Sequence, residues 1–437
     1  MKAKIYEYFD YIVLLSILVL ITFGVLFIYS SGINSDGVNV SNEYIKQIIW
    51  ACVGLVFLTV FTLYDYRKIE RLAPWLYITL IVLLVITRLF GREVNGAVSW
   101  IGFGGLGVQP SEFGKVFFIL YFAKFLDDSK NDEELGRFIK ALALLMIPVG
   151  LILIQPDMGT GSVYIPIFLV MCFMAGIPLR FILFVLFFGL TTIFIAILPV
   201  WNSQIADNPL TIISILTTTK LRIILIGTTS IISLISVYVR RYLKGPKYFY
   251  WIAYFSIILT LGLVFSLGLS KFLKDYQIKR LIIFMNPQVD PLGAGWNIIQ
   301  SKTAIGAGGL WGRGFLGGTQ SHYRFLPQQS TDFIFSILSE ESGFVGGLVI
   351  YGLYLTILLR MAHSMRKIPN KYGLYIVSGV FAMFSFHFII NVGMVMGMMP
   401  ITGIPLLFLS YGGSSLLTAM SCSGLYMSIN FRKKDLQ

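Results

Sequence analysis

Three acidic side chains, in segments far apart along this 437-residue chain, are the residues best suited to chemistry. Asp332 ends a polar, glycine-rich stretch and precedes an apolar run, in which Ser336 and Glu340 follow at four-residue spacing. On a helix this spacing places them on one face that descends about 12 Å. Such a stripe would not be tolerated facing lipid. Asp332 is therefore a candidate catalyst, with an N-cap of the following helix as the alternative interpretation.

Two further acids stand near the starts of other apolar runs. Glu112 and Lys115 are three residues apart and share a helical face near the membrane boundary, where ionised groups are costly unless they pair or line a polar cavity. An ordinary helix start after Pro110 is the other interpretation. Asp157, in a tight glycine-containing turn, either caps the next helix or faces the same cavity as Glu112, binding a divalent cation or orienting a basic side chain.

Basic and aromatic side chains accompany these acids. Lys302, Arg313 and Arg324 lie in the glycine-rich stretch, where backbone amides can approach a ligand closely and the cations suit a phosphate or pyrophosphate. Glycine runs alone are weak evidence. Trp100 is either an interfacial anchor or a ring that stacks on a sugar beside a cavity.

The composition places these residues in a membrane protein. Hydrophobic residues make up 56% of the chain, charged residues make up 13%, and the mean hydropathy is +0.79, which no soluble core accommodates. We expect an all-α polytopic protein with one transmembrane domain over residues 1–437, whose first apolar span is retained. The three cysteines are scattered in apolar runs and predict neither a disulfide framework nor a zinc site.

About 12 transmembrane helices follow from a requirement of about 20 apolar residues per span. They are expected near residues 11–30, 45–64, 72–90, 110–126, 139–155, 160–176, 179–199, 217–239, 248–270, 333–360, 373–390 and 403–430. Lys and Arg concentrate in alternate loops, which predicts cytoplasmic termini and an outward-facing loop over residues 271–332, before the tenth span. That loop would carry part of the active site. The net charge of +13 reflects this topology rather than nucleic acid binding.

The motifs around these residues resemble those of the SEDS proteins (shape, elongation, division and sporulation), the polytopic peptidoglycan glycosyltransferases that include RodA and FtsW. The matching stretches span most of the chain and are residues 95–115, 155–161, 290–318, 327–343 and 400–415. Gly317-Gly318-Thr319-Gln320 and Thr402-Gly403-Ile404-Pro405 are more similar to the elongation branch, RodA, than to the division branch, FtsW.

The resemblance implies polymerisation of lipid II at the outer face of the bacterial cytoplasmic (inner) membrane, in cell elongation and shape. The 4-hydroxyl of a GlcNAc would attack the anomeric carbon of a second disaccharide's MurNAc and expel undecaprenyl pyrophosphate. Asp332 matches the family's essential aspartate and would be the general base. The leaving pyrophosphate would be stabilised by a divalent cation (Mg or Mn, ligands unknown) or by Lys115, Lys302, Arg313 or Arg324. The expected cavity residues are Trp100, Glu112, Asp157 and Glu340.

The chain departs from the family pattern in three places, one of which is Ser339-Glu340-Glu341-Ser342-Gly343, where Gly-Glu-Glu-Leu-Gly is common. Gln328 and Ser330 stand where a glutamate and a histidine are usual, and if that histidine helps proton transfer, Ser330 cannot replace it. The spans near 217–239 and 248–270 are interpreted as a helix pair inserted, within residues 201–270, into a ten-span plan. Being even in number, the insertion preserves the topology.

The resemblance also implies a partner, a class B penicillin-binding protein that acts as a transpeptidase. Other functions stay open at this stage: an FtsW-like division polymerase, a flippase or transporter of lipid-linked precursors, or a non-catalytic scaffold. Transporters place their sites near the membrane midplane on broken helices. Glu112, Asp157 and Asp332 instead map to the outer boundary, which favours the enzyme.

Overall fold

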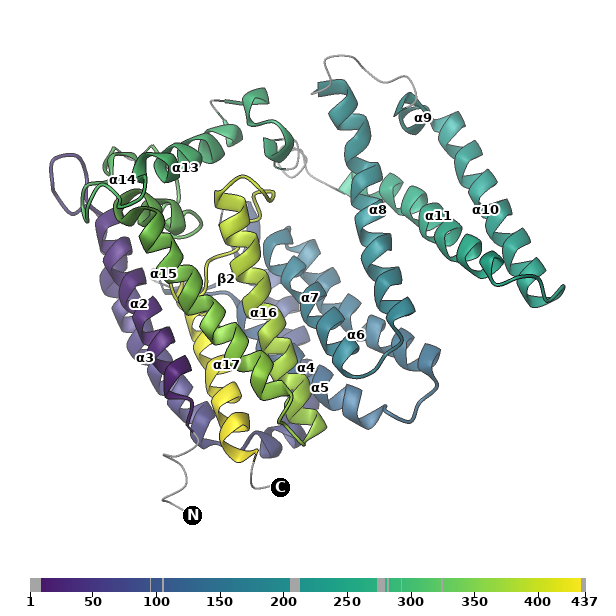
Figure 1. The fold of residues 1–437 in the computed structure, drawn as a ribbon, viewed down its shortest axis with the longest axis horizontal. Coiled ribbons are helices and arrows are strands. Elements are labelled where there is room, and N and C mark those ends of the chain that lie inside the picture. The colour runs from purple at the N-terminus through teal and green to yellow at the C-terminus, as the bar shows by residue number, and fades with distance from the viewer. Residues whose placement is uncertain are drawn as a thin grey trace. The chain divides into compact units, whose positions relative to one another are not determined.

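The computed structural model describes residues 9–94, 96–103, 106–204, 213–272, 280, 283–291, 293–323 and 325–433, and helices predominate in it (Figure 1). The helices are α2 (Tyr11–Ser31), α3 (Glu43–Leu63), α4 (Tyr66–Phe90), α5 (Pro110–Asp128), α6 (Glu134–Ile154), α7 (Met158–Met174), α8 (Leu179–Gln204), α9 (Ser214–Thr217), α10 (Thr219–Arg241), α11 (Tyr248–Phe272), the short η3 (Pro287–Val289), α13 (Ala294–Gly308), α14 (Thr319–His322), α15 (Ile334–Met365), α16 (Lys371–Val395) and α17 (Gly413–Arg432).

Every predicted span coincides with one of these helices, which confirms the all-α membrane fold class. Within the described residues, nine helices are long and apolar enough to cross a membrane. The predicted spans at α5, α7 and α17 are not among the nine: α7 has 17 residues, and α5 carries Glu112, Lys115 and Lys124. The total of 12 spans therefore stays a prediction. The predicted start of the last span was wrong, because residues 401–412 form an irregular loop and α17 begins only at Gly413.

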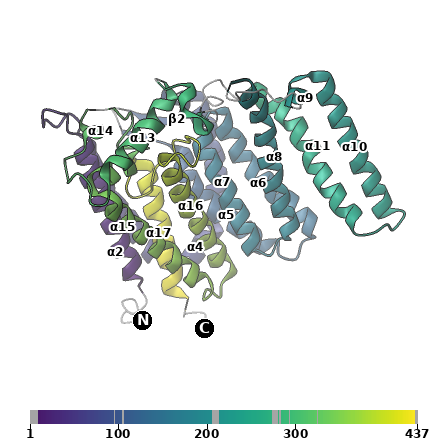
Figure 2. The same cartoon turned by 45° about the horizontal axis from the view of Figure 1, so that its top comes forward.

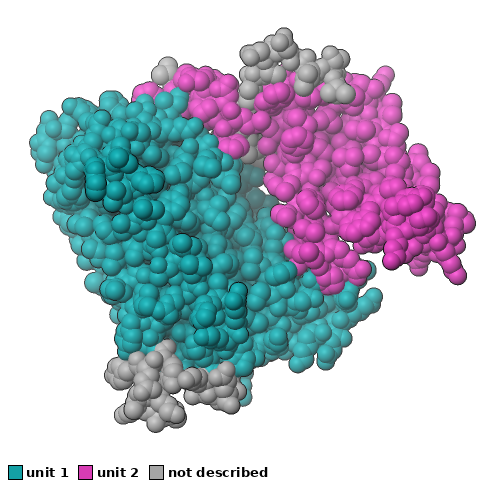
Figure 3. Space-filling view, in the orientation of Figure 1, with its two compact units in different colours: residues 1–177, 297–437 teal, residues 178–296 magenta. Residues whose placement is uncertain are grey.

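The chain forms two compact units, coloured separately in Figure 3: residues 1–177 with 297–437, and residues 178–296. The second unit contains α8 and the predicted inserted pair, α10 and α11. Hydroxyl groups join this pair, with 2.9 Å between Ser233 Oγ and Ser256 Oγ and 2.9 Å between Thr260 Oγ1 and Thr229 Oγ1. That the units act as one transmembrane domain, and that the pair is an insertion, stay predictions.

In the first unit, segments distant in sequence meet at both ends of the helices (Figures 1 and 2). At one end, the Tyr426 hydroxyl of α17 donates to Asp10 before α2 over 3.0 Å, and Arg432 donates to the Leu63 carbonyl at the end of α3 over 2.6 Å. At the other end, Ser301 of α13 contacts both Ser336 near the start of α15 (2.8 Å) and the carbonyl of Val395 at the end of α16. The segments predicted to face outward in this unit therefore gather at this second end.

A small antiparallel sheet of order β1-β2-β3 also lies at this end, formed by Arg92–Val94, Ala97–Phe103 and Leu106–Val108. No strand was predicted here. The Val98 amide donates to the Gln155 carbonyl over 3.2 Å, and the Gln155 side chain donates to Leu84 over 2.8 Å, which fastens the sheet to α4 and to the end of α6. The half-buried ring of Trp100 covers Gly107, where a Cβ would lie 2.9 Å from the ring.

Helix α15 is broken at Gly343, whose φ of 66° and ψ of −163° are not helical. A break leaves backbone groups unpaired, which lipid cannot satisfy. Here the loop after α13 pairs them. The amides of Arg313 and Gly314 donate to the two carbonyls of residues 340 and 341, each over 3.0 Å, and the amides of residues 344 and 345 donate to the carbonyls of Gly309 and Leu310 over 2.9 and 3.1 Å.

Replacing Gly343 by alanine should destabilise the protein by about 2–4 kcal/mol, because the backbone conformation is strained for any side chain and a Cβ would lie 2.3 Å from the Gly312 amide nitrogen. The measurement is the midpoint of thermal unfolding in detergent. Gly352→Ala on the same helix is the control, since a Cβ there would meet no atom within 4 Å and alanine favours a helix over glycine. Equal midpoints for the two variants would contradict the prediction.

Candidate functional site

The irregular loop of residues 401–412, between α16 and α17, contacts the segments that carry the predicted acids. Its Tyr411 amide donates to the Ser330 carbonyl over 2.8 Å, just before Asp332. Its Thr402 carbonyl lies so near Gly159, two residues after Asp157, that a Cβ there would be 2.5 Å away. The loop is therefore the common neighbour of two predicted site segments.

Burial raises the pKa of the Tyr411 phenol in this loop, and the charge of Glu43 adds to this effect.

Asp332 lies half-buried immediately before α15, and its carboxylate is next to this loop. A Cβ on Gly403 would lie 3.4 Å from Asp332 Oδ2, and Gly403 has a φ of +69° that favours glycine. The Asp332 carbonyl accepts from Asn391 Nδ2 over 3.0 Å. The N-cap of α15 is Phe333, without a side-chain cap, so the interpretation of Asp332 as an N-cap was wrong.

Glu112 and Lys115 form a buried ion pair. Lys115 Nζ lies 2.7 Å from Glu112 Oε1, and Lys115 and Glu112 are 0% and 4% exposed. The ammonium also lies 3.2 Å from His387 Nε2 of α16, whose Nδ1 is 2.9 Å from the Pro405 carbonyl of the 401–412 loop. The pyrophosphate role predicted for Lys115 does not fit this arrangement, because its charge is enclosed by protein groups. The pair instead links α5 through His387 to the loop.

Asp157 is an N-cap, as one of its two interpretations predicted. Its Oδ1 accepts from the Thr160 amide over 3.1 Å, and its Oδ2 accepts from the Gln109 side chain over 2.6 Å. The Gln109 amide in turn donates to Ser414 over 3.0 Å. Each carboxylate oxygen accepts from a protein donor, and a divalent cation at Asp157 stays a prediction. Together, Asp157 and Gln109 join the starts of α5, α7 and α17.

Glu340, predicted as a cavity residue, holds a loop. Fully buried, it accepts from the amides of Thr319 and Gln320 over 2.8 and 3.1 Å. Its neighbour Glu341 accepts from the Leu316 amide over 3.1 Å and from the hydroxyl of Ser30 on α2. The two acids therefore fasten the turn before α14 to α15, and Glu341 also joins α15 to α2.

The basic candidates divide by exposure. Lys302 is exposed on α13, with its side chain against Gly397. Arg313 is also exposed and donates to Thr319 Oγ1 over 2.8 Å. Arg324 lies outside the described residues. Lys302 and Arg313 are thus the cations among these candidates that solvent or a substrate can reach in this structure.

No group of three or more His, Cys, Asp or Glu residues in the described part of the chain could hold a metal ion. The protein side chains there do not by themselves fit a metal centre. Mg²⁺ is commonly held by one or two carboxylates together with substrate phosphates. A divalent cation here would therefore need the substrate's phosphate oxygens among its ligands.

The family model described as FtsW, RodA and SpoVE, "Cell cycle protein", matches residues 11–208 and 207–435. The chain belongs to this family. It is 52% identical to the peptidoglycan glycosyltransferase RodA of Treponema pallidum, over 97% of this chain and 98% of that protein. It is 31% identical to the peptidoglycan glycosyltransferase MrdB of Escherichia coli K12, over 98% of this chain and 95% of that one. It is accordingly a multi-span membrane protein of a bacterial family.

Two solved structures share the fold of this protein. The rod shape determining protein RodA of Thermus thermophilus is 21% identical, with a TM-score of 0.59 over 98% of this chain and 97% of that one. A chain from a peptidoglycan synthase complex that coordinates polymerization and crosslinking is 24% identical, with a TM-score of 0.65 over 97% of this chain and 98% of that one. These likenesses support the fold alone.

Several residues at the end of the first unit that carries Asp332 were not predicted from the sequence. Gln109, Asn391 and the 401–412 loop join its elements, yet none was singled out as a site residue. Both ring nitrogens of His387 have polar partners, the Lys115 ammonium and the Pro405 carbonyl. The available signal was the spacing of His387 and Asn391, two polar residues four apart in an otherwise apolar run.

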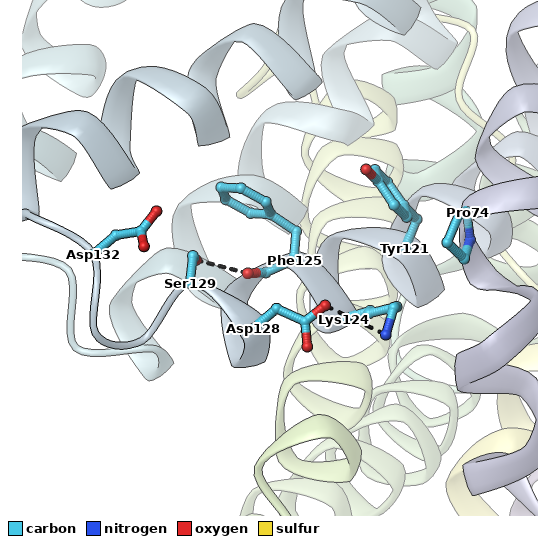
Figure 4. Close-up of a pocket in the computed structure, with 7 residues that line it drawn as sticks. All are labelled: Pro74, Tyr121, Lys124, Phe125, Asp128, Ser129 and Asp132. Carbon is cyan, nitrogen blue, oxygen red and sulfur yellow. Dashed lines mark hydrogen bonds and ion pairs between the residues drawn. The ribbon is translucent and has the colours of Figure 1, made fainter.

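A cavity of about 340 Å³ lies near the opposite end of α5 (Figure 4). It is lined by Pro74, Tyr121, Lys124, Phe125, Asp128, Ser129 and Asp132. Lys124 pairs with Asp128 over 3.3 Å. None of the predicted site residues lines this cavity, and it has no part in the candidate site.

Proposed function

We propose that this chain is a peptidoglycan glycosyltransferase that polymerises lipid II, in the elongation branch of its family. The observation that carries the proposal is the 52% identity with a RodA glycosyltransferase along 97% of the chain. The half-buried carboxylate of Asp332, at the end of the bundle where the polar loops gather, is the group best placed to act as general base.

The proposed step transfers one glycosyl group. Asp332 accepts the proton of the 4-hydroxyl of a GlcNAc, whose oxygen forms a bond to the anomeric carbon of MurNAc on a second lipid II. The bond between that carbon and the pyrophosphate oxygen breaks, and its electron pair leaves with undecaprenyl pyrophosphate. Among the predicted cations, the exposed Lys302 and Arg313 suit the charge of this leaving group.

Glycan synthesis from lipid II is the test of this proposal. The purified protein, with lipid II and Mg²⁺ in detergent, should give glycan strands that a gel resolves by length. A flippase would instead move lipid II across a vesicle membrane and form no polymer, and that result would overturn the proposal. The flippase is not favoured, because the acids lie at the ends of helices and not midway along them.

A divalent cation is part of the proposal, since it would neutralise the pyrophosphate. We expect EDTA to lower the rate of glycan synthesis by at least about tenfold, and added Mg²⁺ or Mn²⁺ to restore it. The control is EDTA saturated with Mg²⁺ beforehand, which should leave the rate unchanged. If EDTA leaves the rate unchanged, no divalent cation is needed, and basic side chains would neutralise the pyrophosphate instead.

The setting completes the proposal. The chain would lie in the bacterial cytoplasmic membrane with both termini inside, so that the end carrying Asp332 faces outward, where the polymer grows. The partner would be a class B penicillin-binding protein, a transpeptidase. This partner is implied by the resemblance of the motifs to the SEDS family, and the likeness to a chain of a peptidoglycan synthase complex adds only that the fold is shared.

A further inference from the structure

Two fully buried polar side chains, His387 and Asn391, project from α16 one turn apart. Asn391 Nδ2 donates to two carbonyl oxygens, those of Asp332 over 3.0 Å and of Ile404 over 2.8 Å. His387 Nδ1 lies 2.9 Å from the next carbonyl, that of Pro405. One helix face therefore holds the backbone of Asp332 and of the 401–412 loop at the same time.

The partners of His387 determine which of its nitrogens carries the proton. The Pro405 carbonyl can only accept, so Nδ1 must be the donor. The Lys115 ammonium can only donate, so Nε2 must accept from it over 3.2 Å. The ring is thus oriented from both sides. Because the Lys115 ammonium, paired with Glu112, donates to Nε2, the ring proton is on Nδ1 and is donated to the Pro405 carbonyl.

The held loop contains Gly403, a neighbour of the Asp332 carboxylate. Gly403 precedes the anchored residues 404 and 405 and lies next to Asp332 Oδ2. At the far end of the loop, the Tyr411 amide donates to Ser330 over 2.8 Å. A shift of the loop would therefore move the wall of the site and the backbone on either side of the base. A displacement of about 1 Å can lower a rate about 100-fold.

We propose that His387 and Asn391 are positioning residues for the glycosyl transfer, which hold Asp332 and the 401–412 loop in one arrangement through the carbonyls of Asp332, Ile404 and Pro405. The inference rests on the proposed function of Asp332. It assigns no contact with substrate to either residue. The expected signature is a lower kcat with an unchanged KM for lipid II.

Two substitutions at His387 separate its two contacts. His387→Asn places an amide donor where Nδ1 stands and keeps the bond to Pro405, whereas His387→Gln carries its polar group to the Nε2 position and loses that bond. We expect His387→Gln and Asn391→Leu to lower kcat by about 10- to 100-fold per folded molecule, with KM within about twofold. His387→Asn should recover most of the loss.

Ser378→Ala is the matched control, because Ser378 is equally buried in α16 and, among the described residues, donates within its own helix, to the Tyr375 carbonyl over 2.7 Å. It should keep the kcat of the unchanged protein. The inference is overturned if His387→Gln and Asn391→Leu reduce the amount of folded protein but leave kcat per folded molecule intact, or if His387→Asn is as slow as His387→Gln. If His387→Gln does not fold, His387→Asn is compared with Asn391→Ser instead. The inference then expects Asn391→Ser to lose kcat and His387→Asn to keep it. An active Asp332→Asn variant would instead refute the proposed base, so the two failures are distinguishable.

Discussion

Glycan synthesis by Asp332→Asn should fall by about 10²- to 10⁴-fold, the range that a general base contributes. Asparagine has the size of aspartate and retains the backbone contact with Asn391, but its amide cannot take the proton of the acceptor hydroxyl. The KM for lipid II should change little, because the carboxylate acts on the reacting hydroxyl. Initial rates of strand formation from purified lipid II give both parameters.

Asp36→Asn is the control for this prediction. Asp36 is an exposed acid in the loop after α2, and its side chain contacts only nearby Asn34 among the hydrogen bonds found in the described residues. Its variant should polymerise lipid II at the normal rate. A folded Asp332→Asn protein with more than about a tenth of the normal kcat would exclude Asp332 as the base.

Breaking the buried ion pair should give the largest effect on stability. Lys115→Met leaves the Glu112 carboxylate buried without its cation, which is expected to destabilise the protein by about 3–5 kcal/mol. The double variant Glu112→Gln, Lys115→Met removes both charges and should recover a large part of this loss. Thermal unfolding of the purified proteins in one detergent measures both changes.

An exposed pair provides the comparison. Lys140 and Asp132 are 2.9 Å apart, with side chains 62% and 41% exposed, and such pairs contribute at most about 1 kcal/mol. Lys140→Met should therefore leave the unfolding midpoint nearly unchanged. If Lys115→Met unfolds no earlier than Lys140→Met, the buried carboxylate has another source of charge compensation and the argument for the pair is wrong.

The positions of the helices follow from the sequence, because hydropathy is a local property and each apolar run must satisfy its own backbone as a helix. All the predicted spans coincide with helices for this reason. The pairing of Glu112 with Lys115 is local too, since three residues separate them on one helical face. The cap at Asp157 is equally local, with its acceptor three residues before the Thr160 amide.

The roles of other site residues depend on partners that no local pattern identifies. Glu341 meets Ser30, 311 residues earlier, and Lys115 meets His387, 272 residues later. Glu340 has the spacing of a cavity residue, yet it accepts the amides of a loop some 20 residues before it. A carboxylate makes the same pattern in sequence whether it faces water or backbone donors, so only its packing separates the two.

The sequence by itself determined the class of protein, the course of its helices and the family motifs that single out Asp332. The tertiary structure decided the break at Gly343, the sheet that contains Trp100, and the attachment of the 401–412 loop to α16 through His387 and Asn391. The physical reason is that apolar burial acts on each segment separately, whereas a buried hydrogen bond needs both partners, and folding alone brings partners hundreds of residues apart within about 3 Å of each other.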